Sequence, residues 1–134
     1  MSHATKIIEA NSALITNGNL DQIGDYFTKN YTVHLTNRVI EGGHGIVQKI
    51  LSELRHSFTN IQLDVEILLE SEDRIAWQRT FRATHAEKFK NFPASGLQIV
   101  WRDMVTSRFK DELIAEEWVI TDLAEQLLLS RKRN

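Results

Sequence analysis

The chain has 134 residues, of which 42% are hydrophobic and 25% are charged, as is ordinary for one soluble globular domain, expected here over residues 1–134. The formal net charge of −2 gives no electrostatic reason to expect binding to nucleic acid or to an anionic membrane. No cysteine is present, which excludes disulfides and thiolate metal sites. No apolar run approaches the roughly 20 residues of a membrane span, and the N-terminal stretch does not resemble a signal peptide, so a cytoplasmic location is the default expectation.

The first half of the chain has mostly helical periodicity. Apolar residues near helical spacing predict a helix over residues 4–15, and the Asn-Gly-Asn sequence at 17–19 favours a stop and a turn. A short second helix is expected over 19–27, followed by a β-branched and aromatic strand over 30–36. A single apolar stripe then predicts a helix over 46–58.

In the second half the apolar period changes to two, as expected for strands. Four strands are predicted over residues 61–69, 75–85, 97–109 and 113–121, and the last apolar stretch, 122–129, is expected to be a helix. Helices first and adjacent antiparallel strands afterwards form an α+β pattern. We expect a curved antiparallel sheet that wraps around the N-terminal helices as a cone, with an internal pocket between the concave face and the helices.

Asp122 ends the last predicted strand and begins the last predicted helix. Alternation places it on the same strand face as Trp118, so a concave face would put both side chains at the pocket wall. A carboxylate against apolar walls has a raised pKa and can exchange protons near neutral pH, which makes Asp122 a candidate general acid/base. It could instead be only the N-cap of the helix, with Glu125 completing a capping box.

Two histidines are candidates for polarising or orienting a ligand. His85 ends the second long strand in phase with Trp77 and Phe81, although a hydrogen-bonded histidine at a strand end has the same pattern. His34 lies in the strand over 30–36 and could face either a cavity or solvent. None of the five histidines has tight metal-ligand spacing, so no metal site is expected.

Arg79 shares a strand face with Trp77 and Phe81. It could bind a carbonyl or carboxylate of a ligand, or form an ion pair with an acid on a neighbouring strand. Trp77, Phe81 and Trp118 are candidate walls for a flat ligand, although tryptophans on adjacent strands are also typical of a core. The sequence has no Gly-rich phosphate loop at a strand–helix junction and no G-x-S-x-G elbow.

Several segments, in this order, resemble a known family: GGHGIVQKILSELRHSF, RATHAEKF, FPASGLQIVWRDMVTSRF and EEWVITDLAEQLL. Over about residues 5–128 the chain resembles the SnoaL-like polyketide cyclase (ester cyclase) family of the nuclear transport factor 2-like superfamily. The family's histidine segment, its P-x-x-G loop, its W-x-x-x-D pattern and its upstream histidine correspond to Thr84-His85, Pro93 to Gly96, Trp118 to Asp122, and His34.

The resemblance implies a cone of curved sheet and helices, and a cofactor-free ring closure of a hydrophobic carbonyl compound by intramolecular aldol condensation. It implies Asp122 as the general acid/base. Such a closure also needs donors near the enolate oxygen, for which His85, His34 and Arg79 are the candidates. Alanines at positions 83 and 86 replace the glycines usual around the family's histidine; these bulkier groups could reshape the pocket mouth, so the resemblance leaves the substrate type open.

Three hypotheses about function follow. The first is a cofactor-independent cyclase or isomerase that acts on a hydrophobic small molecule. The second is a non-catalytic pocket domain that binds an apolar small molecule or a partner. The third is a structural dimerisation domain, because curved sheets of this shape pair through their outer face. A homodimer is therefore expected, with Val100 and Met104 on the paired surface.

Overall fold

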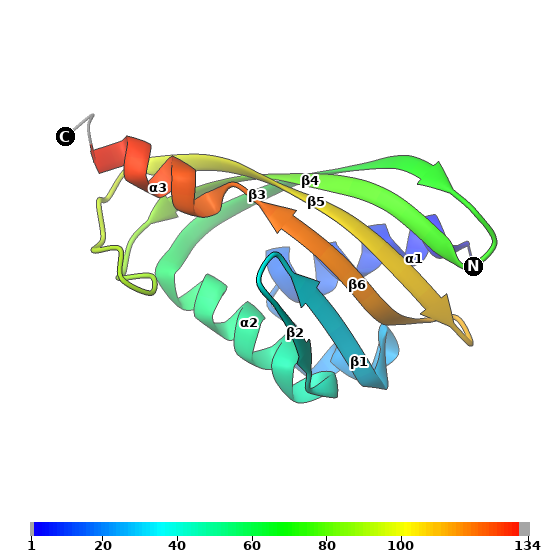
Figure 1. Ribbon diagram of the computed structural model, residues 1–134. Helices are drawn as coiled ribbons and strands as arrows, with labels where there is room; N and C mark the ends of the chain where they lie inside the picture. The colour runs from blue at the N-terminus through cyan, green and yellow to red at the C-terminus, as the bar shows by residue number, and fades with distance from the viewer. Residues whose placement is uncertain (1, 132–134) are drawn as a thin grey trace.

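A curved, unclosed six-stranded sheet forms one layer of the computed structural model, which describes residues 2–131 (Figure 1). The strands are β1 (Phe27–Leu35), β2 (Arg38–Glu41), β3 (Phe58–Glu70), β4 (Arg74–His85), β5 (Gln98–Lys110) and β6 (Leu113–Thr121), in the spatial order β2-β1-β6-β5-β4-β3. The predicted α+β class with a curved sheet is therefore confirmed.

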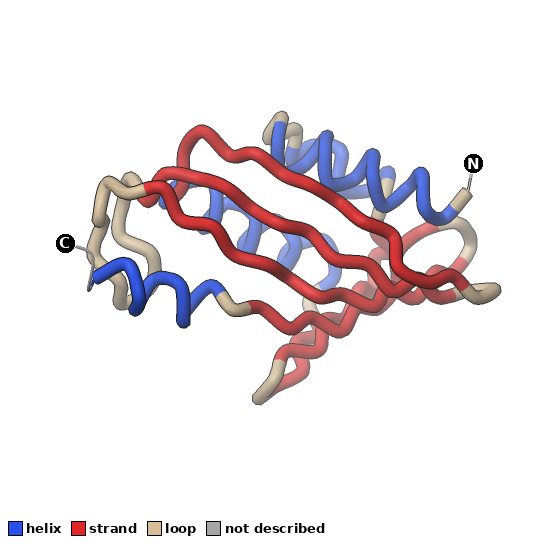
Figure 2. The backbone as a smooth tube through the Cα atoms, turned by 90° about the horizontal axis from the view of Figure 1, so that it is seen from above, coloured by secondary structure: helices blue, strands red, loops and turns tan. Residues whose placement is uncertain are grey.

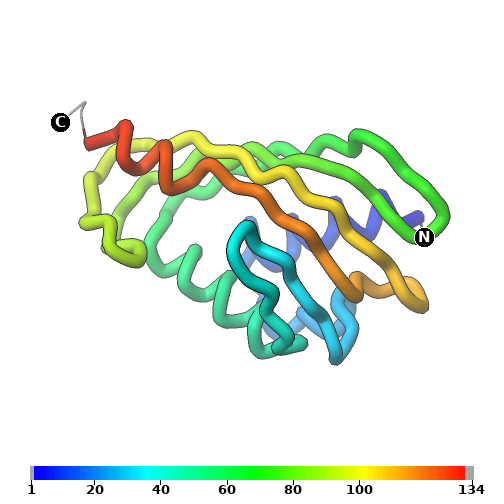
Figure 3. The backbone as a smooth tube through the Cα atoms, viewed as in Figure 1, coloured from blue at the N-terminus to red at the C-terminus, as the bar shows by residue number. Residues whose placement is uncertain are grey.

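The sheet is mixed, because β1 and β6 run parallel whereas every other neighbouring pair is antiparallel. Figure 3 shows these two strands, far apart in the sequence, lying side by side. The expectation of a wholly antiparallel sheet is thus wrong at this one pairing. The short strand β2 has no counterpart in the sequence prediction. It contains only four residues, all paired with β1.

The helical segments are α1 (His3–Ala10), the π-helical η1 (Asn11–Thr16), the 3-10 helix η2 (Leu20–Asp25), α2 (Gly43–Ser57) and α3 (Leu123–Arg131). The segments α1 and η1 contact β3, α2 contacts β1, and α3 contacts β5. Figures 1 and 2 show α1 and α2 on one side of the sheet, against its concave face. Within residues 2–131, no helix combines the length and apolar character needed to cross a bilayer.

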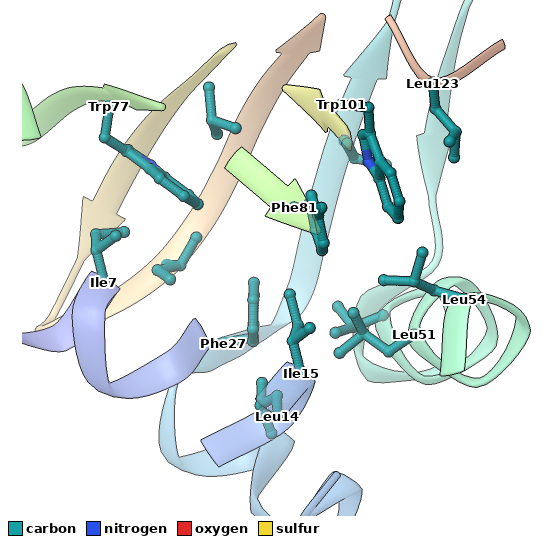
Figure 4. Close-up of a cluster of buried hydrophobic side chains, with 14 of the residues drawn as sticks. Ile7, Leu14, Ile15, Phe27, Leu51, Leu54, Trp77, Phe81, Trp101 and Leu123 are labelled. Carbon is teal, nitrogen blue, oxygen red and sulfur yellow. The ribbon is translucent and has the colours of Figure 1, made fainter. Parts of the chain in front are cut away.

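The core lies between the concave face and these helices (Figure 4). Burial alternates along β4 and β5, so one face of each strand contributes to the core. The labelled core side chains come from helices and sheet alike: Ile7, Leu14, Ile15, Leu51, Leu54 and Leu123 from helical segments, and Phe27, Trp77, Phe81 and Trp101 from the sheet. Gly43 permits the approach of α2 to β1, because its φ is +55° and a Cβ there would lie 2.1 Å from the Lys29 carbonyl oxygen.

A β-bulge interrupts the alternation of β6. Phe109 pairs with Ile114 whereas Arg108 pairs with Glu116, so Ala115 is an extra residue in β6. The bulge reverses which side chains face inward for the rest of the strand. Ile114 and Glu117, three residues apart, consequently both line the concave side.

Candidate active site

A cavity of about 250 Å³ lies between the concave face of the sheet and the helices. It is larger than the roughly 150 Å³ cavity that suffices to bind benzene, so it has room for a ligand larger than one small ring. One part of its wall is buried and includes Ile7, Tyr31, Trp77, Ile114 and Glu117. Exposed residues line the part near the 86–97 loop, the second half of α2 and the end of β6, where the cavity reaches the surface: Ile50, Glu53, Lys90 and Thr121.

Glu117 places a carboxyl group in the buried part of this wall. Tyr31 donates its O–H to Glu117 Oε1 over 2.7 Å, and Ser107 donates its O–H to Glu117 Oε2. The Ser107 hydroxyl in turn accepts the Trp77 indole N–H at 2.9 Å. Donors from β1 and β5 therefore hold the two oxygens of this carboxyl group, and Trp77 of β4 holds one of those donors.

The environment shifts the proton affinities of this cluster. Burial raises the pKa of Glu117, against the hydrogen bonds from Ser107 and Tyr31, which lower it. Burial, followed by the nearby Glu117 charge, raises the pKa of Tyr31 well above its usual value, so Tyr31 stays a proton donor in this bond. A carboxyl group that holds its proton more tightly than usual in a largely apolar cavity is suited to proton transfer near neutral pH.

Arg79 joins a second polar group to the same cavity. Its Nε donates to Asp103 Oδ2 and its Nη1 donates to Asn11 Oδ1, both at 2.9 Å. The guanidinium lies 5.2 Å from the ring centroids of Trp77 and Phe81, over their faces. Two of its five N–H donors are used in these bonds, so the remaining N–H groups can serve a ligand.

Asn11 reaches this cluster at the point where α1 changes to the π-helical turn η1. Its amide donates to the Ile7 carbonyl at 2.9 Å, which orients its side-chain oxygen toward Arg79. Single π-helical turns inside helices are frequent at functional sites.

The structure brings three of the predicted ligand-binding residues to the cavity. Trp77, Arg79 and Phe81 all line it. Phe81 is stacked on Trp101 with ring centroids 4.5 Å apart, and Arg79 forms the ion pair with a neighbouring strand's acid that was one of its two predicted arrangements. The shared strand face predicted for these residues is confirmed.

Asp122 does not line the cavity, so its predicted position at the pocket wall is wrong. Its Oδ1 accepts the backbone N–H of Arg102 at 2.8 Å, and its Oδ2 accepts the Gln126 amide at 3.2 Å. The carboxylate thus ties the start of α3 to β5 instead of forming a capping box with Glu125. The physical reason is the bulge at Ala115, which turns this phase of β6 outward.

Trp118 and His34 lie on the outer face of the sheet, and neither lines the cavity. The bulge turns Trp118 outward, whereas His34 simply alternates with the buried Tyr31 and Val33 of β1. Their rings are stacked with centroids 4.7 Å apart, and His34 Nε2 is 2.6 Å from Glu116 Oε2. Arg108 completes this outer cluster through a 2.9 Å ion pair with Glu116 Oε1. The expected inward orientation of Trp118 is therefore wrong, and His34 takes the outward one of its two predicted orientations.

His85 is buried, with 1% of its surface exposed, but it does not line the cavity either. Its ring is stacked on Phe58, with centroids 5.1 Å apart. Neither ring nitrogen has a hydrogen-bond partner among the described residues. Burial lowers the pKa of His85, which favours the neutral ring.

Sequence reasoning did not single out Tyr31, Asp103, Ser107 or Glu117. Asp103 and Ser107 alternate in phase with Trp101, so strand periodicity carried a signal for both. For Glu117 the sequence carried no clear signal, because the apolar and acidic residues of β6 come in runs instead of alternating. Among residues 2–131, no group of three His, Cys, Asp or Glu side chains is arranged to hold a metal ion.

Several solved structures are similar to this chain over nearly its whole length. The solved structure of a "putative polyketide cyclase" from Acidithiobacillus ferrooxidans is 22% identical, covers 98% of this chain and 99% of its own, and has a TM-score of 0.86. IdmH from Streptomyces antibioticus, titled in the same words, is 18% identical, covers 96% and 97%, and has a TM-score of 0.82. AclR from Streptomyces galilaeus, titled a "putative hydroxylase", is 22% identical, covers 98% and 96%, and has a TM-score of 0.81. At these identities the likeness establishes the fold.

No curated protein matches the chain at a significant level. The family model described as SnoaL-like polyketide cyclase matches residues 5–128, which is nearly the whole chain. The chain therefore belongs to the SnoaL-like polyketide cyclase family and shares its nuclear transport factor 2-like fold.

Proposed function

We propose that the chain catalyses cofactor-independent proton transfer at a carbon beside a carbonyl group, leading to intramolecular aldol ring closure of a hydrophobic small molecule. The observation that carries this proposal is Glu117, a carboxyl group with a raised pKa in the buried wall of the cavity, held by two donated hydrogen bonds. Membership of a family of polyketide cyclases supports the reaction class. Glu117 takes the acid/base role that the resemblance alone assigned to Asp122.

The reaction begins with the ionised Glu117 carboxylate removing a proton from the carbon, which leaves an enolate and a protonated carboxyl group. The enolate carbon then forms a bond to a second carbonyl carbon of the same molecule, and the carbonyl π electrons move to its oxygen. Glu117 returns its proton to that alkoxide, so the net reaction is an isomerisation. A proton between two carbonyl groups is already acidic, and a positioned carboxylate with raised pKa is a sufficient base.

Arg79 stabilises the enolate oxygen in this proposal. Its guanidinium is fixed by Asp103 and Asn11, and it retains N–H groups that these two partners do not use. A donor that is already oriented costs no reorganisation when negative charge develops on the oxygen. Trp77 and Phe81 provide flat apolar walls that hold a flexible chain folded for attack.

The test compares the two adjacent glutamates of β6. The probe is ethyl benzoylacetate, a β-keto ester with an apolar ring, and NMR follows exchange of its acidic C–H for deuterium at mildly acidic pH. Glu117→Gln should lower the catalysed exchange by about 100-fold or more, because general acid/base groups contribute that much. The matched control, Glu116→Gln, should exchange close to the wild-type rate, since Glu116 lies on the outer face.

Both variants are first checked for a wild-type unfolding transition. If folded Glu117→Gln exchanges the probe at the wild-type rate, Glu117 is not the acid/base. If wild-type protein binds the probe but does not accelerate its exchange, the cavity belongs to a non-catalytic binding domain instead.

We further propose that the chain forms a homodimer through the outer face of the sheet. Met104 and Ile120 are cross-strand partners there, and both are exposed, as is Val100 on the same face. Pairing of two copies would remove this apolar strip from water. Light scattering should report a dimer for wild-type protein and a monomer for Met104→Glu, and a monomeric wild type would refute the proposal.

A further inference from the structure

Asp103 carries a buried oxygen that lines the cavity side of the sheet. The residue is 6% exposed and belongs to the cavity wall. Its Oδ2 accepts the Arg79 Nε–H, but its Oδ1 receives no hydrogen bond from the described residues. Because a buried carboxylate oxygen without a donor loses its hydration uncompensated, a donor on a bound molecule would recover a substantial interaction there.

The charge balance around Asp103 favours an uncharged donor. Arg79 already contacts the carboxylate and neutralises it, at a nitrogen–oxygen distance of 2.9 Å. Much of the remaining wall is apolar and includes Leu14, Val47 and Phe81. A ligand cation would lose its hydration in these surroundings without a second carboxylate in contact, whereas a hydroxyl group would lose much less.

The strand register separates the backbone positions of Asp103 and of the proposed acid/base, although the Asp103 charge still contributes to raising the pKa of Glu117. Asp103 pairs with Arg79 and with Thr121, whereas Ser107, the partner of Glu117, lies four residues further along β5. At about 3.3 Å per residue the two positions are roughly 13 Å apart along the strand. Thr121 is exposed and lies at the part of the cavity that reaches the surface, so Asp103 is the nearer of the two acids to the mouth.

We propose that Asp103 Oδ1 accepts a hydrogen bond from an uncharged hydroxyl group of the ligand and thereby selects hydroxylated apolar compounds. The hydroxyl lies toward the mouth of the cavity, away from the carbon that faces Glu117. This inference rests on the proposed function in treating the cavity as the ligand site. It adds a specificity residue and a substrate class to that site.

The test measures binding of small aromatic probes that have no acidic C–H. Phenol and anisole are a matched pair, because the methyl ether keeps the oxygen and the ring but loses the donor. NMR titration of wild-type protein should show phenol binding roughly tenfold more tightly than anisole, as a hydrogen bond to a charged acceptor predicts. In the wild-type complex the phenol O–H proton should give a separate downfield resonance.

Asp103→Asn is the diagnostic variant. Its amide oxygen can still accept from Arg79, which leaves an N–H donor where Oδ1 stood. The preference for phenol over anisole should then fall to near unity, while Asp64→Asn, a change at an exposed carboxylate of β3, should leave it unchanged.

Equal binding of phenol and anisole by wild-type protein, or no binding of either, would overturn the inference. So would tighter binding of benzylamine than of phenol, because the site would then prefer a cation. Repeating the titration with Glu117→Gln separates the two proposals. A phenol preference that persists in Glu117→Gln shows that the hydroxyl site does not depend on the acid/base. If wild-type protein prefers phenol but does not accelerate exchange of the β-keto ester, only the catalytic proposal is refuted. If wild-type protein accelerates the exchange but binds phenol and anisole equally, only the hydroxyl site is refuted.

Discussion

Glu116 and Glu117 are neighbours on β6, yet they lie in opposite chemical environments. Glu117 faces the cavity, and burial raises its pKa. Glu116 faces outward, where the hydrogen bond with His34 lowers its pKa, assisted by Arg108. One step along a strand reverses the direction of the shift, because successive side chains point to opposite faces of a sheet.

The comparison shows that the number of hydrogen-bond partners does not by itself decide the proton affinity of a carboxyl group. Both carboxyl groups accept two side-chain hydrogen bonds. Glu116 receives its bonds from an arginine and a histidine at a partly hydrated surface, whereas both donors to Glu117 are uncharged hydroxyl groups inside the protein. Loss of hydration therefore dominates at Glu117, and attraction to the charged or chargeable partners dominates at Glu116.

The largest difference between the two faces is expected for their arginines. Arg79→Leu leaves Asp103 buried without its partner and should reduce the free energy of unfolding by about 3 kcal/mol. Arg108→Leu breaks the corresponding outer ion pair and should cost below about 1 kcal/mol. Urea unfolding of both variants measures the difference, and equal costs would show that the two faces are not energetically distinct.

Removal of the Ser107 hydroxyl tests the same difference between the two faces of the sheet, with a smaller expected effect on stability. Ser107→Ala removes a donor to Glu117 and an acceptor for the Trp77 indole, so it should cost about 1–3 kcal/mol in unfolding free energy. The loss of this donor should also raise the pKa of Glu117 further, which a carbon-13 NMR titration of the carboxyl group would detect. Thr106→Ala, on the opposite face of β5, is the control, and a comparable stability loss there would argue against the buried cluster.

The two glutamates should affect the pH dependence of the free energy of unfolding in opposite directions. The pKa of Glu117 is higher in the folded state than its ordinary value of 4.5, so between these values the folded state holds more protons than the unfolded state. The free energy of unfolding therefore falls as pH rises through the folded pKa. Glu117→Gln should remove this decline, because the amide does not titrate. An unchanged pH profile would mean that Glu117 is not the buried titrating group.

Glu116 should show the opposite and smaller dependence. Its folded pKa lies below the ordinary value, so its contribution is present above 4.5 and is lost as pH falls through the folded pKa. Glu116→Gln should lower stability at neutral pH by less than about 1 kcal/mol, since the group is partly exposed. In acid the variant and the wild type should become equally stable, and a difference that persists there would contradict this origin.

Much of the fold could be read from apolar spacing, because burial on one face imposes a period. Ile75, Trp77, Phe81 and Ala83 share the inner face of β4 as their alternation predicts. The parallel pairing of β1 with β6 could not be read in the same way, since local patterns do not specify which distant strands become neighbours. The candidate site was found in part: Trp77, Arg79 and Phe81 line the cavity, and Asp122 does not.

The sequence by itself determined the family, the α+β class and the inward face of the long strands, because residue order and hydrophobic period survive without knowledge of long-range contacts. Only the tertiary structure decided which carboxyl group of β6 enters the cavity. One extra residue at Ala115 moves Glu117 inward and leaves Asp122 outside, and such a bulge is set by the pairing of β6 with β5. The environment that raises the pKa of Glu117 exists only once three strands have brought Tyr31, Ser107 and Trp77 around it.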